Sequence, residues 1–169
     1  MAIGLLGLVL AIGAAGLFLR LYMERAAESR LRPGEDVAVV ELRGPLPQNA
    51  FLACPPGHCA LATAAPSPIF ATDADRLYQA VMRLVASEPR SVIVLAEPRR
   101  RRIVAIQRSA VFGFPDIVIA QCIALGPDRA SLALYSRARY GREDFGVNRR
   151  RVEAWLARLR QRAAPPSDQ

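Results

Sequence analysis

The chain has 169 residues, which is enough for one folded domain with a short appendage. Hydrophobic residues make up 52% of it and charged residues 22%, which excludes a disordered or collagen-like chain. All 23 basic residues are arginine, and the formal net charge is +8. One histidine and three cysteines leave few ligands for a zinc site built by the protein alone.

The first residues of the chain are apolar. Residues 1–19 contain no charged side chain, and Arg20 and Tyr22 follow them. Because about 20 apolar helical residues cross a bilayer core of roughly 30 Å, we expect an uncleaved transmembrane anchor over residues 1–23. A cleaved signal peptide is the alternative, but the segment lacks a basic start and a clear small-x-small cleavage site.

This anchor predicts a single-pass protein of a bacterial inner membrane. Two signals disagree on the side that carries the soluble part. The positive-inside rule favours the cytoplasm, because basic residues follow the span and none precedes it: Arg20, Arg25, Arg30 and Arg32. A cysteine pair at Cys54 and Cys59 favours the periplasm, towards which we lean.

Residues 24–67 read as a juxtamembrane helix followed by a proline-rich spacer. The helix is expected to stop at Pro33 and Gly34. Six prolines lie between residues 33 and 67, with one short apolar run at residues 37–42 that could form a strand. We expect this spacer to pack only loosely on the following residues.

Residues 68–163 show the periodicities of a folded domain. Thr72 is a candidate N-cap for a helix that ends near Ser87. Four strand-like runs follow, at residues 91–96, 102–110, 116–125 and 130–137. A second helix is predicted by apolar residues that share one face: Val152, Trp155, Leu156 and Leu159. Residues 164–169 are expected to be a disordered tail.

The predicted domain is therefore an α+β fold of two layers. Its element order is αββββα, with an antiparallel four-stranded sheet and both helices on one face.

Residues 136–153 read SRARYGREDFGVNRRRVE. This segment resembles the C-terminal signature of the domain-of-unknown-function 1499 family. The matching positions are Ser136, Arg139, Gly141, Asp144, Phe145, Gly146, Val147, Asn148 and Arg151, whereas Tyr135 and Ala138 depart from the pattern. The runs FGFPD at 112–116 and CPPGHC at 54–59 also resemble family elements. The resemblance implies an architecture but no activity.

The signature residues have a structural interpretation. Gly141 and Gly146 permit backbone angles that other residues avoid. Asp144 or Asn148 can cap the last helix, and Arg139 is expected to pair with Asp144 or Asp116. This clamp would tie strand, turn and helix together.

A second interpretation makes the segment a ligand site. Arg149, Arg150 and Arg151 lie in the first turn of the last helix, where the helix dipole disfavours cations. Three such cations beside free helix amides could hold a phosphate or carboxylate group.

Cys54 and Cys59 flank a Pro-Pro-Gly turn and allow three states. They could form a disulfide, remain free thiols, or bind a metal together with His58; the last lacks a fourth ligand, so we expect no metal and no cofactor.

No catalytic motif or nucleic-acid-binding signature is present, so we expect neither an enzyme nor a nucleic-acid partner. We expect a non-catalytic domain that binds a small anionic or lipid-like ligand at the membrane lipid surface. The alternative is a structural or assembly protein that binds a membrane-protein partner.

Overall fold

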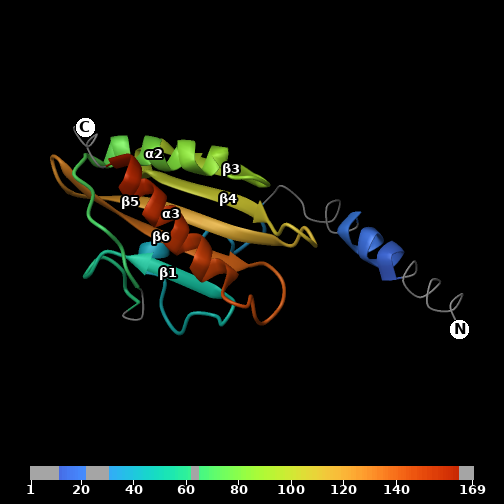
Figure 1. Cartoon of the computed structure of the whole chain (residues 1–169). Helices are drawn as coiled ribbons and strands as arrows, with labels where there is room; N and C mark the ends of the chain where they lie inside the picture. Colours follow the sequence, from blue (N-terminus) through green and yellow to red (C-terminus); the bar gives the residue numbers. More distant parts are fainter. Residues whose placement is uncertain (1–11, 22–30, 62–64, 164–169) are drawn as a thin grey trace, which may run out of the picture.

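The computed structural model of the chain describes residues 12–21, 31–61 and 65–163 (Figure 1). Residues 12–21 are helical. The elements that follow are η1 (Val39–Glu41), β1 (Ala50–Cys54), β2 (Ala65–Pro66), α2 (Ala74–Ser87), β3 (Ser91–Glu97), η2 (Pro98–Arg100), β4 (Arg102–Arg108), β5 (Pro115–Gly126), β6 (Arg129–Ala138) and α3 (Val147–Ala163).

The strands form one six-stranded sheet in the order β2-β1-β6-β5-β4-β3. All neighbours are antiparallel except β1 and β2, which pair in parallel. The predicted antiparallel four-stranded sheet and the αββββα order are therefore wrong. The two strands that we missed lie in the expected spacer. β1 is short, and polar and apolar residues do not alternate along it. It pairs with β6, which follows about 80 residues later in the chain (Ala50 opposite Arg137). The sequence around β1 therefore contains no pattern that predicts a strand.

Helices α2 and α3 cover one face of the sheet (Figure 1). Apolar residues of both helices pack on the side chains that β4, β5 and β6 direct to this face. The largest contributors are Leu77, Val81, Leu84, Trp155 and Leu159. The N-cap of α2 is Asp73 rather than Thr72, because the Asp73 carboxylate accepts the main-chain N–H groups of Asp75 and Arg76.

The opposite face of the sheet is covered by residues 31–49, which we call the strap. Val39 in η1 is 0% exposed and packs among Val104, Ile117 and Ile119 of the sheet. The proline-rich segment is thus part of the core rather than the loosely packed spacer that we expected. This burial could not be predicted from the sequence, because a segment without regular secondary structure shows no periodic spacing of apolar residues.

Two buried arginines attach the strap to the sheet. The Arg102 guanidinium, at the start of β4, pairs with Glu97 and with Asp36 of the strap. Arg139, at the end of β6, pairs with Glu35 of the strap. Each arginine thereby neutralises a carboxylate from a distant part of the chain.

In the part of the chain that the structure describes, the predicted transmembrane anchor is not found. Of its residues, 1–11 and 22–23 lie outside the described part of the chain, as do most of the expected juxtamembrane helix and the tail over 164–169. In residues 12–21, 31–61 and 65–163, no helix has both the length and the apolar composition needed to cross a bilayer.

The burial of Val39 gives a test of the strap. We expect Val39→Ala to lower the free energy of unfolding by about 2 kcal/mol, because it removes buried methyl groups and leaves a cavity. Urea denaturation measures this, with Val92→Ala on the exposed side of β3 as the control. Equal stability of the two variants would show that the strap does not pack on the sheet.

Candidate functional site

One end of the sheet carries most of the polar residues that the sequence singled out. At this end β6 stops and β5 begins, with Ala138 opposite Asp116, and β1 begins opposite Arg137. The loops over residues 109–114 and 139–146 and the first turn of α3 gather there (Figure 1). We call this region the loop end.

The centre of the loop end is the guanidinium of Arg151. It donates to Asp116 Oδ2 at 2.6 Å and to Gln107 Oε1 at 2.5 Å. It also donates to Ser136 Oγ at 2.9 Å and to Asn148 Oδ1 at 2.5 Å. The side chains of Arg151 and Asp116 are each only 8% exposed. A buried cation is tolerated here because all of its partners are supplied by the fold.

Asn148 extends this network to β1. Its carboxamide accepts from Ser136 Oγ at 2.6 Å and donates to the main-chain oxygen of Asn49 at 2.9 Å. The Asn49 side chain in turn donates to the main-chain oxygen of Gly141 at 2.6 Å. The first turn of α3, strands β4, β5 and β6, the end of the strap at Asn49 and the 139–146 loop are thus held by one connected set of hydrogen bonds.

Asp144 caps the N-terminus of α3. Its carboxylate accepts the main-chain N–H groups of Gly146 at 3.1 Å and of Asn148 at 2.7 Å. The helix amides that we considered for an external anion therefore already have an anionic partner within the chain.

Arg139 pairs with neither of the partners that we expected. Its guanidinium donates to both carboxylate oxygens of Glu35, at 2.7 and 2.6 Å, while Arg151 holds Asp116. The sequence offered no means to choose between the two arginines, because both belong to the signature and neither is a sequence neighbour of Asp116.

The pKa values of the two buried carboxyls shift in opposite directions. Burial alone would raise the pKa of Glu35, but hydrogen bonds from the Arg139 side chain and the Arg32 main chain outweigh it and lower the pKa. For Asp116 burial is the larger effect and raises the pKa, although the charge of Arg151 opposes it.

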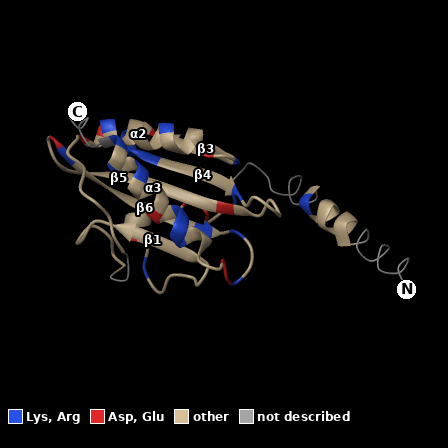
Figure 2. Cartoon of the chain, in the orientation of Figure 1, with Lys and Arg blue, Asp and Glu red and all other residues tan. Residues whose placement is uncertain are grey.

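The three arginines of the first turn of α3 diverge. Arg149 is exposed and pairs with Glu153, and Arg150 donates to the main-chain oxygen of Phe145 at 3.0 Å. Arg151 alone turns inward to the sheet. These basic positions are concentrated on the first turn of the helix (Figure 2).

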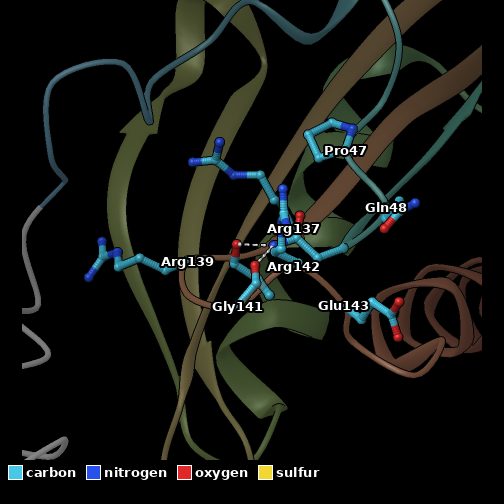
Figure 3. A pocket seen from close by; sticks show the side chains of 9 residues that line it. Pro47, Gln48, Arg137, Arg139, Gly141, Arg142 and Glu143 are labelled. Atoms are coloured by element: carbon cyan, nitrogen blue, oxygen red, sulfur yellow. Dashed lines mark hydrogen bonds between the residues drawn. The ribbon is translucent and has the colours of Figure 1, made fainter.

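A first hollow of about 780 Å³ lies on the strap side of the loop end. Pro47, Arg137 and Arg142 border it, while the Arg139 side chain points away from them (Figure 3). The dashed lines in this view are the bonds from Asn49 Nδ2 to the carbonyl oxygens of Ala138 and Gly141.

A second hollow of about 600 Å³ lies between α3 and the ends of β3 and β4, and we call it the arginine groove. Five arginines line it, together with one carboxylate, Glu88, and apolar residues that include Trp155: Arg90, Arg108, Arg150, Arg151 and Arg158. Arg151 pairs with Asp116 and Arg158 with Glu88, whereas the hydrogen bonds of Arg90 and Arg150 go to main-chain oxygens.

The cysteines lie away from both hollows. Cys54 and Cys59 are joined by a disulfide at the end of β1, and His58 contacts the Pro56 carbonyl oxygen. Burial raises the pKa of Cys122 to about 12, so its thiol stays protonated. Within the described residues, no three His, Cys, Asp or Glu side chains cluster in a way that could hold a metal.

Three residues of the network were not among our candidates. Gln107 was detectable in principle, because it is a polar residue within the apolar run of β4. Glu35 and Asn49 carried no signal, since both lie in the segment that we took for a spacer.

The comparisons with known proteins add one match. The family model described as "Protein of unknown function (DUF1499)" matches residues 51–159. No curated protein and no solved structure matches the chain significantly.

The network predicts that substitution of Arg151 lowers the free energy of unfolding much more than substitution of Arg149, two residues earlier. Arg151→Met should lower the free energy of unfolding by about 3–5 kcal/mol, because it leaves Asp116 buried without its cation. Arg149→Met removes an exposed pair with Glu153 and a cation–π contact with the Phe51 ring, and should cost less than about 2 kcal/mol. Urea denaturation compares them, and a similar loss in both variants would contradict the central role of Arg151.

The lowered pKa of Glu35 predicts a pH dependence. A carboxyl whose folded pKa lies below its unfolded pKa stabilises the fold at neutral pH, and this contribution is lost as the pH falls through the folded pKa. Between about pH 6 and about pH 3, the wild-type protein should therefore lose more stability than Glu35→Gln. Asp116 is common to both proteins, so parallel curves would refute the role given to Glu35.

Proposed function

The chain belongs to the family described as "Protein of unknown function (DUF1499)", a description that assigns no activity, and we propose from its own residues that the domain binds a small anionic ligand in the arginine groove. The observation that carries this proposal is the excess of arginine over carboxylate in one hollow.

The charge balance of the groove favours an anion. Five arginines line the hollow, and two of them are neutralised, Arg158 by Glu88 and Arg151 by Asp116 behind the lining. The hydrogen bonds of Arg90 and Arg150 go to main-chain oxygens, of Arg108 and Phe145 respectively. These two guanidinium groups keep donors and a full positive charge for a phosphate or carboxylate, which guanidinium binds in a bidentate manner.

The walls of the groove indicate the rest of the ligand. Val147, Ala154 and Trp155 contribute apolar surface beside the cations. A volume of about 600 Å³ lies in the range of small-molecule sites, roughly 300–1,000 Å³. The ligand that fits this lining has an anionic head and a short apolar part.

The lining supports binding rather than catalysis. It supplies donors and charge, whereas a covalent mechanism needs a nucleophile with a base beside it. Ser109 is the hydroxyl residue of the groove, and its oxygen accepts the main-chain N–H of Phe114. We therefore propose a non-catalytic module.

The single tryptophan of the chain provides the assay, because Trp155 lines the groove. We expect its fluorescence to change on titration of the full-length protein with glycerol phosphate, but not with glycerol. The double variant Arg90→Gln/Arg150→Gln should bind at least about tenfold more weakly, since each lost charged hydrogen bond costs about 1.5–3 kcal/mol.

Arg160→Gln is the matched control, because this exposed residue lies on the same helix and does not line the groove. It should bind like the wild-type protein. Equal weakening in the control would mean that overall charge, rather than the groove, attracts the anion. Absence of any saturable signal with glycerol phosphate would refute the proposed function.

A further inference from the structure

Exposed apolar side chains flank the arginine groove on two loops. Ala110 of the 109–114 loop and Val147 at the start of α3 line the groove itself. The exposed apolar residues there are Val111, Phe112 and Phe114 on the first loop, Phe145 on the 139–146 loop, and Val147 directly after it. Both loops lie at the same end of the sheet in Figure 1, next to the residues Ala110 and Val147 that line the groove.

Phe145 is the least expected of these residues. Its side chain is 86% exposed, and its backbone adopts a left-handed conformation with φ of 51°. A bulky residue in this conformation costs about 1 kcal/mol or more, and its exposed ring gains no burial in return. The fold thus holds a phenylalanine outward at a cost to its own stability, which is typical of a binding residue.

Exposed arginines lie beside these apolar side chains, together with the exposed carboxylate of Glu143. Arg142, Arg149 and Arg150 lie within five residues of Phe145 and are exposed. Arg150 bonds directly to the main-chain oxygen of Phe145. The surface therefore combines protruding apolar side chains with exposed guanidinium groups.

We propose that the loop end docks on the surface of a bilayer that contains anionic lipids. The rings of Phe112, Phe114 and Phe145 enter the interface, and the surrounding arginines contact the lipid phosphates. The inference rests on the proposed function in one respect: it takes the anion in the arginine groove to be a lipid headgroup.

A bilayer fits this surface better than a folded protein partner does. The exposed rings stand on two separate loops, with Phe112 and Phe114 in contact on one and Phe145 alone on the other, rather than on one continuous apolar face. A fluid interface accepts such separate insertions without shape complementarity, and anionic lipids attract the arginines beside them.

Hydrogen exchange of the full-length protein with vesicles tests the docking. The readout must be local, because the apolar residues 1–19 can associate with lipid by themselves. We expect vesicles of phosphatidylcholine with phosphatidylglycerol to slow exchange at least fivefold in residues 110–113 and 142–146. Vesicles of phosphatidylcholine alone should leave both loops unchanged, and so should high salt with the anionic vesicles.

Phe145→Asn separates docking from folding. Asparagine tolerates the left-handed conformation better than phenylalanine, so this variant should be at least as stable as the wild-type protein. Combined with Phe112→Ser, it should nevertheless lose the vesicle-dependent protection of both loops. Val92→Ser is the control, because Val92 is a similarly exposed residue on β3 and should leave the protection intact.

The glycerol phosphate titration and the hydrogen-exchange experiment test the groove and the docking separately. Unchanged exchange of both loops on anionic vesicles, with glycerol phosphate still bound in the groove, would overturn the docking and leave the proposed function in place. Two results would overturn the proposal that the groove binds an anionic lipid headgroup. One is equal protection of the loops on neutral and on anionic vesicles. The other is unchanged protection on anionic vesicles in the double variant Arg90→Gln/Arg150→Gln. Protection that appears only with a protein added to the vesicles would favour a protein partner and likewise overturn the proposal.

Discussion

The loop end of this protein depends on the buried guanidinium of Arg151. Removal of this charge from water is costly, and the cost is offset only because Asp116, Gln107, Ser136 and Asn148 all point their oxygens at it. These partners come from β4, β5, β6 and α3, so the helix can occupy only one position on the sheet. The signature residues are thus first of all a structural device that sets the geometry of everything around them.

The arginines of this protein divide into two groups by the presence of a carboxylate. Arg102, Arg139 and Arg151 are buried against carboxylates and hold strap, sheet and helix together. Arg90 and Arg150 have only main-chain oxygens as partners and retain their charge for something outside the chain. The buried arginines hold the walls of the hollow in place, and a guanidinium at the edge of a hollow binds a ligand well only if those walls are rigid.

The loop end also shows where the fold gives up stability. A left-handed Phe145, an exposed ring and unpaired cations are each unfavourable for an isolated domain. The surrounding network of Asn148, Asn49 and Asp144 is what keeps these features in place. Strain supported by a satisfied buried network is expected at a surface that binds a partner.

The positions of α2, α3 and strands β3 to β6 could be predicted from the sequence, because the spacing of apolar side chains within each run of neighbouring residues indicates a helix or a strand. The sequence also marked Ser136, Asn148 and Arg151 as a set. Two ion pairs and one part of the core could be identified only in the folded chain. Arg151 rather than Arg139 binds Asp116, and Glu35 binds Arg139. β1 and the strap complete the core. These pairings join residues up to about a hundred positions apart, and they depend on where the chain returns in space, for which no local pattern carries information.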